Sequence, residues 1–254
     1  MRMILLAAAV SSCCVTAFAI AAPASQPDDV WTGKGQAGLV STQGNSSAKT
    51  ANVALDLSLH HAAWKHTAHL GGLYAQSAGV TSADRWDAGW QSDYSVTPRV
   101  LTFGTLRYAH DMFSGFQYQA SATAGIGYKI LDEKTTHLTV QGGAGYRRSQ
   151  PENIVRNAAG IVTSRTLLAA TGDAILTAGV DYSQDLTATT TLSDKLLLES
   201  GSSDTLVTNA LAVAVKVSEK LALSVGYTLQ NNSKPPAGLK KLDTMETVNL
   251  VYSF

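Results

Sequence analysis

Apolar and polar residues alternate along most of this chain. From Trp31 to the last residue the dominant period is two, which is typical of β-strands with one apolar and one polar face. In residues 116–128, for example, Phe116, Tyr118 and Ile126 fall on one face, while glutamine, serine and glycine residues fall on the other. The pattern predicts about twelve strands, at residues 31–42, 47–60, 64–75, 83–95, 99–110, 116–130, 135–147, 173–185, 187–199, 204–217, 220–230 and 243–254.

The predicted strands are long, and the links between them are of two kinds. Their length of about 11 to 15 residues exceeds the five or six usual in soluble sheets and suits tilted membrane strands of about 9–11 residues. Links after odd-numbered strands are mostly long, such as 43–47 and 76–82, and most of the others are short. The longest link, 148–172, could fold inward or outward, or its tail at 163–168 could lengthen the eighth strand. Short turns on one rim and longer loops on the other are typical of outer-membrane barrels.

Aromatic residues support the same arrangement, because they cluster near the strand ends on the apolar faces. Two aromatic girdles are expected at the interfaces of a membrane barrel, although strands are enriched in aromatic residues in general. Those near the short turns are Trp64, Tyr94, Tyr128, Tyr182, Tyr252 and Phe254, and those near the long links are Tyr74, Trp86, Tyr108, Phe116, Tyr146 and Tyr227.

Composition separates a membrane barrel from a soluble one, which alternation alone cannot do. Charged residues make up 15% of the chain, below the roughly 25% of an average soluble protein. The first 24 residues have the basic start, apolar centre and small-residue end of a secretory signal, with cleavage after Ala19, Ala21 or Ala24. An uncleaved anchor helix is the alternative. We therefore expect an all-β fold, an antiparallel transmembrane β-barrel of about twelve strands over residues 25–254.

Both cysteines, Cys13 and Cys14, lie inside this signal segment. The mature chain then has no thiol, which excludes a disulfide, a cysteine-ligated zinc site and a cysteine nucleophile. The residues before Cys13 resemble a bacterial lipoprotein cleavage box, so lipidation of Cys13 is an alternative outcome of export. The formal net charge is zero without a basic run, which argues against nucleic acid as a partner.

Several short motifs occur in a fixed order along the chain. Trp31 and its strand precede TQGNS at 42–46, Arg107-Tyr108 precedes DMFSG at 111–115, GIGY at 125–128 precedes GAGY at 143–146, and YSF closes the chain. This order resembles the family known as domain of unknown function 481, over essentially all of residues 31–254. Members are often called salt-induced outer-membrane proteins of Gram-negative bacteria. The resemblance implies an outer-membrane barrel and supplies no catalytic residue or cofactor.

The terminal aromatic residues Tyr252 and Phe254 resemble the carboxyl-terminal signal that the bacterial barrel assembly machinery recognises. An extended strand with one apolar face suits recognition by strand addition to an exposed sheet edge. The alternative is a last strand that merely ends in phenylalanine.

If the apolar faces meet lipid, the polar faces line the lumen. Charges of both signs could pair across the lumen and plug it, or they could line a thin aqueous path. Twelve strands fall between the filled eight-stranded barrels and the open barrels of 16 or more strands. Frequent glycine, alanine and serine on these faces favour a small pore. The predicted lumen-lining residues are Lys34, Asp56, Lys65, Arg85, Asp87, Asp93, Arg107, Lys129, Arg147, Asp181, Lys195 and Lys216.

The competing function is an outer-membrane enzyme with a site at the rim. His110 and Asp111 are adjacent on a strand and point to opposite faces, so they do not form a dyad with each other. Ser114 could be reached by His110 across a turn, although a serine that caps a polar loop explains the same residue. Histidines at 60, 61, 66 and 69 form the only histidine cluster, but at most two of them share a face, so no metal site is predicted.

We therefore expect a monomeric outer-membrane protein without a cofactor, either structural or a narrow passive diffusion channel. The resemblance implies a link to osmotic or salt stress. Its expected partners are membrane lipid, lipopolysaccharide and the barrel assembly machinery. The basic link with Lys234, Lys240 and Lys241 is a candidate contact for lipopolysaccharide phosphates. A soluble periplasmic lipid-binding barrel is a further alternative to the enzyme.

Overall fold

A computed structural model describes residues 29–42, 48–157, 162–236 and 239–254 of the chain. The predicted signal segment and Cys13 lie outside these residues. The described residues form thirteen strands: β1 Val30–Thr42, β2 Ala48–His61, β3 Trp64–Ser77, β4 Val80–Ser95, β5 Val100–Asp111, β6 Phe116–Asp132, β7 Thr136–Arg156, β8 Val162–Leu167, β9 Thr171–Asp185, β10 Thr190–Gly201, β11 Thr205–Lys216, β12 Leu221–Asn232 and β13 Leu242–Ser253. The described residues contain no helix that is long and apolar enough to cross a membrane.

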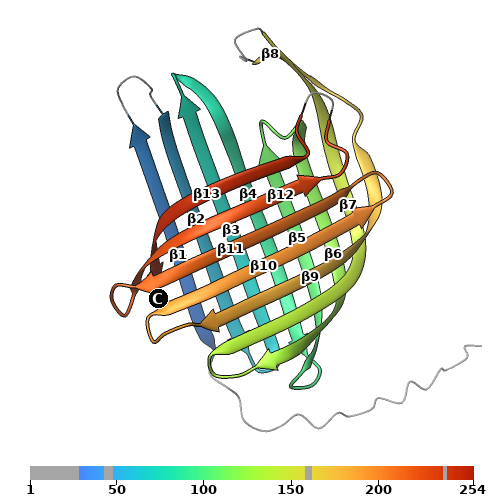
Figure 1. Cartoon of the computed structure of the whole chain (residues 1–254). Coiled ribbons are helices and arrows are strands. Elements are labelled where there is room, and N and C mark those ends of the chain that lie inside the picture. Colours follow the sequence, from blue (N-terminus) through green and yellow to red (C-terminus); the bar gives the residue numbers. More distant parts are fainter. Residues whose placement is uncertain (1–28, 43–47, 158–161, 237–238) are drawn as a thin grey trace, which may run out of the picture.

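Twelve of these strands close into one antiparallel barrel (Figure 1). Each pairs with its neighbours in chain order, except that β7 is followed in the sheet by β9, and β13 returns to β1. The predicted all-β, twelve-stranded antiparallel barrel is therefore confirmed. Each of the twelve barrel strands spans 12 or more residues, and alternation of apolar and polar residues with period two runs through most of them.

The remaining strand, β8, belongs to the longest predicted link. β7 continues to Arg156 and pairs with β8 as a hairpin that extends beyond the barrel rim (Figure 1). The tail of the link thus forms its own strand and does not lengthen the eighth barrel strand. An ion pair between Arg165 Nη1 and Glu152 Oε1, 2.6 Å apart, joins the two strands of the hairpin.

The link after the third strand is shorter than the sequence predicted. β3 runs to Ser77 and β4 begins at Val80, so the proposed link at 76–82 is only a two-residue turn. Ala78 and Gly79 both have positive φ angles, of 48° and 80°. Two consecutive positive φ angles are typical of the tight hairpin turns whose twist matches that of the flanking strands. The prediction of a long link there was wrong.

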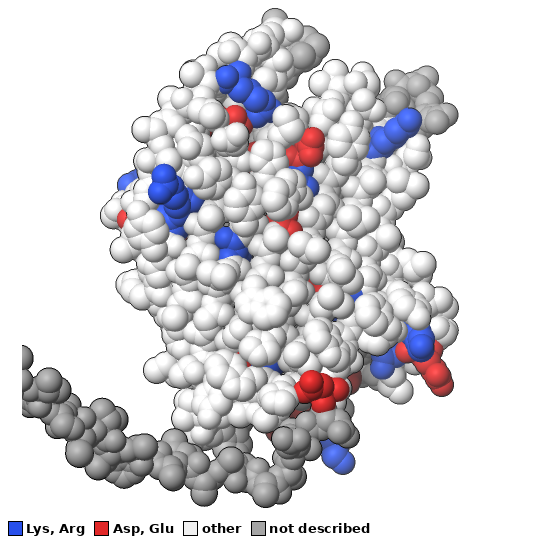
Figure 2. Space-filling model, turned by 180° about the vertical axis from the view of Figure 1, so that it is seen from behind, with Lys and Arg blue, Asp and Glu red and all other residues white. Residues whose placement is uncertain are grey.

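The outer surface of the barrel is largely apolar. Exposed leucine, valine and tyrosine side chains occupy alternate positions on most strands, among them Leu70, Leu106 and Leu176. Figure 2 shows one side of the molecule, where a broad uncharged area separates charged groups near the lower rim from those farther up. Aromatic rings contact each other on the outer face: Trp86 stacks on Tyr108 with ring centroids 5.0 Å apart, and Trp64 packs at a tilt against Tyr94 with centroids 4.9 Å apart.

Apolar side chains also pack inside the barrel on one part of its wall. Phe103 and Ile175 are among the few buried hydrophobic residues. The Phe103 ring lies against glycines of β6 and β7: a Cβ at Gly125 would be 2.8 Å from the ring, and one at Gly143 would be 3.0 Å from it. Glycine in the GIGY and GAGY motifs therefore allows a close approach of this ring to the wall.

The first and last strands meet along a short seam. β1 and β13 pair only over Lys34–Ala37 and Leu250–Ser253, whereas β1 pairs with β2 along its whole length. At the lower end, Phe254 and Gly33 exchange backbone hydrogen bonds, with N···O distances of 3.0 and 2.8 Å. Beyond the paired part the two strands diverge toward the long-loop end of the barrel (Figure 1).

Candidate functional site

The candidate site begins with a row of charged and polar side chains on one face of the sheet. Directly opposite residues in antiparallel strands share a face. Lys34 lies opposite Asp56, Asp56 lies opposite His69, and the same row continues through Gly89 to Arg107 on β5. Farther along, Ser121 of β6 and Arg147 of β7 complete it.

Two contacts across the barrel show that this face is the interior. Arg107 Nη1 of β5 lies 3.5 Å from Glu199 Oε1 of β10, although β6, β7 and β9 separate these strands in the sheet. Arg85 Nη2 of β4 lies 2.9 Å from Met245 Sδ of β13, with β1, β2 and β3 between them. Side chains of such distant strands can meet only through the lumen.

By their strand register, the predicted lumen-lining residues lie on this interior face. They are Lys34, Asp56, Lys65, Arg85, Asp87, Asp93, Arg107, Lys129, Arg147, Asp181, Lys195 and Lys216. Some pair along the wall and some pair across the lumen. Lys195 Nζ lies 3.5 Å from Asp181 Oδ2 on the neighbouring strand, whereas Arg107 reaches across to Glu199.

A carboxylate, an imidazole and a second carboxylate form a chain on the β2–β3–β4 wall. His69 Nδ1 lies 2.6 Å from Asp56 Oδ1, and His69 Nε2 lies 3.1 Å from Asp87 Oδ2. Gly71 leaves room for this chain, because a Cβ there would lie 2.8 Å from Asp87 Oδ1. The sequence did not predict this chain, although His69 and Asp87 each fall on a predicted polar face.

The other histidines of the predicted cluster do not join His69. His66 lies on the outer face, where its ring centroid is 5.6 Å from that of Trp64 and 5.7 Å from that of Trp90. His61 pairs with Asp29 near the lower rim. The described residues hold no group of three or more histidine, cysteine, aspartate or glutamate side chains placed to bind one metal ion.

A buried ion pair lies near the long-loop end of the interior. Arg147 of β7 and Asp204, between β10 and β11, contact each other, and their side chains are only 4% and 8% exposed. Glu199 is buried close by and also accepts a hydrogen bond from Ser121 Oγ at 3.4 Å. Glu199 shares a face with Lys195, so alternation could have found it, whereas Asp204 lies in a connection without a periodic signal.

The connection between β12 and β13 crosses the long-loop mouth of the barrel. It contacts the β5–β6 turn, which lies on the opposite wall, with four strands in between on either side. Gly115 of that turn has a φ of +77°, and a Cβ there would lie 2.8 Å from both Leu239 Cδ1 and Pro236 Cγ. Two independent features therefore require glycine at this position: the positive φ angle of the backbone and the close contact with the connection.

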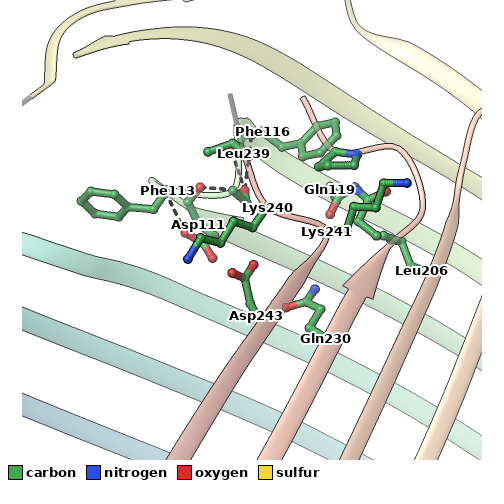
Figure 3. A pocket seen from close by; sticks show the side chains of 13 residues that line it. Asp111, Phe113, Phe116, Gln119, Leu206, Gln230, Leu239, Lys240, Lys241 and Asp243 are labelled. Carbon is green, nitrogen blue, oxygen red and sulfur yellow. Dashed lines mark hydrogen bonds between the residues drawn. The ribbon is translucent and has the colours of Figure 1, made fainter. Parts of the chain in front are cut away.

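A cavity of about 230 Å³ lies beneath this connection (Figure 3). We call it the mouth pocket. Its walls come from both sides of the barrel, so no local sequence pattern predicts it. The lining residues are Asp111, Phe113, Ser114, Phe116, Gln119, Leu206, Gln230, Asn232, Pro235, Leu239, Lys240, Lys241 and Asp243. Phe116, assigned from the sequence to the outer aromatic girdle, lines this pocket instead, because it lies at a β-bulge where β6 begins.

The two residues of the alternative enzyme site have separate partners. His110 is hydrogen-bonded through Nδ1 to the carbonyl oxygen of Gln117, and its ring centroid is 6.2 Å from that of Trp86 on the outer face. Ser114 Oγ donates to the carbonyl oxygen of Asp111 at 2.9 Å within its own turn. The structure therefore does not bring His110 and Ser114 together, and Ser114 acts as a turn cap.

The predicted assembly-signal residues lie at the lower end of the seam. The rings of Tyr252 and Phe254 stack with centroids 6.0 Å apart, and the Phe254 ring covers Gly33 of β1. Both aromatic side chains are exposed on the outer face. The final residue thus completes barrel closure and presents an apolar ring to the surroundings of the barrel.

Comparison with known families completes this description. The family model described as "Protein of unknown function, DUF481" matches residues 35–254. The chain belongs to this family. A relative with the same family membership is the "Uncharacterized protein YdiY" of Escherichia coli (strain K12), 24% identical over 227 residues that cover 85% of this chain and 81% of YdiY.

Solved barrels resemble this DUF481 chain at low sequence identity. The NanC porin is 11% identical, with a TM-score of 0.47 over 89% of this chain and 99% of NanC. The translocator domain of the autotransporter NalP from Neisseria meningitidis is 14% identical, with a TM-score of 0.45 over 89% of this chain and 87% of that domain.

Proposed function

We propose that this protein is an outer-membrane β-barrel that acts as a narrow passive diffusion channel for small polar solutes. The observation that carries the proposal is the charged interior face, which is enclosed by a complete ring of strands with an apolar outside. Charged groups are expensive to remove from water unless they are paired, and the interior residue Lys34 has no ion pair within 4 Å among the described residues. An interior with both charge signs and incomplete pairing therefore favours a water-filled path.

Two arginines make this path narrow. Arg107 reaches Glu199 on one side of the lumen, and Arg85 reaches Met245 on the other. Their side chains divide the interior into smaller passages. On β11 and β12, by contrast, the interior face carries small residues such as Ala210, Ala212 and Ser224, which leave more room next to the wall.

Single-channel recordings of the refolded protein in planar bilayers test the proposal. Heat-modifiable migration on gels serves as the folding control. We expect small, reproducible conductance steps, and a folded barrel that remains silent would refute the channel function. Ion selectivity is expected to be weak, because interior charges of both signs alternate.

A pair of double variants tests the arginine constriction. The change R107A with E199A removes two charges that meet across the lumen, and we expect a clear rise in conductance. The matched control, D181A with K195A, also removes one acid and one base, but these side chains pair along the wall. Equal conductance changes in the two variants would show that Arg107 and Glu199 do not form the constriction.

The remaining parts of the proposal concern the surroundings of the barrel. We propose a monomer in the outer membrane, in contact with lipopolysaccharide and inserted by the barrel assembly machinery through Tyr252 and Phe254. Recovery in the outer-membrane fraction after a carbonate wash tests the location. A role in osmotic or salt stress is tested by growth of a deletion strain at raised salt, with and without the gene supplied on a plasmid.

A further inference from the structure

We propose that the mouth pocket binds a sugar acid, a single polyhydroxylated ring or chain that carries one carboxylate. The inference rests on the proposed channel function only for the onward path of the solute, since binding itself requires no conduction. Three features of the pocket carry the argument: its free polar groups, its aromatic wall and its size.

The polar groups of the pocket are available to a ligand. Gln230 and Asp243 lie directly opposite each other on β12 and β13, so they share the interior face. Lys240 and Lys241 belong to the connection that crosses the mouth. Figure 3 shows the side chains of all four residues around one space. Among the described residues, none of these four side chains has a hydrogen-bond or ion-pair partner.

The mixture of these groups selects the chemistry of the ligand. Amide and carboxylate groups such as those of Gln230 and Asp243 suit hydroxyl groups, which both donate and accept hydrogen bonds. The two lysines supply donors for a carboxylate. A purely apolar ligand would leave all of these groups unpaired, at a high desolvation cost. A polyanion such as phosphate would meet the carboxylates of Asp111 and Asp243 as well as the lysines.

The remaining wall suits the C–H face of a sugar ring. Phe116 of β6 and Leu239 of the connection both line the pocket, the first with an aromatic ring and the second with an aliphatic side chain (Figure 3). The cavity volume of about 230 Å³ lies below the roughly 300–1,000 Å³ of pockets for drug-sized ligands. A single sugar acid therefore matches the pocket better than an oligosaccharide does.

Isothermal titration calorimetry on the refolded barrel in detergent micelles tests the inference. The probes are D-glucuronate, D-glucose and L-glutamate. We expect glucuronate to bind at least tenfold more tightly than glucose, which lacks the carboxylate. Absence of glucuronate binding to the folded barrel, equal binding of glucose, or preferential binding of glutamate would each overturn the assignment.

Variants of the connection place the binding in the pocket. The change K240Q with K241Q alters two exposed side chains, and we expect at least a tenfold loss of glucuronate affinity. The control K234Q removes a lysine of the same connection that does not line the pocket, and we expect affinity as in the unaltered protein. Equal affinity in both variants would overturn the proposed site.

The same chemistry occurs on acidic sugars of lipopolysaccharide, so a parallel titration uses purified lipopolysaccharide. Binding of free glucuronate supports a diffusible solute, whereas binding of lipopolysaccharide alone would overturn it. The two proposals can fail separately. Glucuronate binding to a barrel without conductance would refute the channel function and support the sugar-acid site. Conductance without glucuronate binding would support the channel function and refute the sugar-acid site.

Discussion

The substitution Gly38→Ala should weaken the closure of the barrel. At the upper end of the β1–β13 seam, Asn52 Nδ2 of β2 donates a hydrogen bond of 2.7 Å to Asn249 Oδ1 of β13. This bond passes over Gly38 of β1, which lies between the two strands. A Cβ at Gly38 would contact the side-chain oxygens of both asparagines and would lie 2.6 Å from the carbonyl oxygen of Val248.

The expected loss of stability follows from these contacts. The backbone carbonyl of Val248 can move only with the strand, so the methyl group imposes strain of about 1–3 kcal/mol. Asn249 is buried, and loss of its partner costs about 1–3 kcal/mol for the unsatisfied amide. Replacement of glycine by alanine restricts the unfolded chain and offsets up to about 1 kcal/mol. The free energy of unfolding should therefore fall by about 1–6 kcal/mol.

Urea titration of the refolded protein, followed by heat-modifiable gel migration, measures this loss. Gly35→Ala is the matched control, because Gly35 lies in the same strand and seam but its Cβ would meet nothing within 4 Å. The control should unfold at the same urea concentration as the unaltered protein or slightly above it. If the two variants unfolded within about 0.5 kcal/mol of each other, the contacts around Gly38 would not stabilise the seam.

Two further predictions concern charge burial and assembly. Asp204→Asn leaves the buried guanidinium of Arg147 without its ionised partner and should lower the free energy of unfolding by about 3–5 kcal/mol. Asp181→Asn breaks the exposed pair with Lys195 and should cost less than about 1 kcal/mol in the same urea titration. Phe254→Ala should still refold in vitro and should lower the free energy of unfolding by about 1 kcal/mol or less, because the Phe254 ring is exposed. In cells, the same variant should reduce the yield of the protein in the outer-membrane fraction several-fold. Equal yields would remove the role of this ring in assembly.

The sequence predicted the barrel because its main determinant is local. Alternation with period two decides which side chains of a strand share a face, and this assignment does not depend on where the strand begins or ends. The charged positions from Lys34 to Lys216 could therefore be assigned to one face before any pairing was known. Strand ends were less well predicted, as the Ala78–Gly79 turn shows, because the extent of a hairpin depends on hydrogen bonds to its partner strand.

Only the tertiary structure decided which of these side chains meet. The contact between Arg107 and Glu199, the bond from Asn52 to Asn249 and the mouth pocket all join strands far apart in the sequence. Their positions depend on the register of the closed ring and on how its walls face each other. Alternation fixes the face of a residue but carries no information about its neighbour across the lumen, because that neighbour is set by closure of the whole barrel.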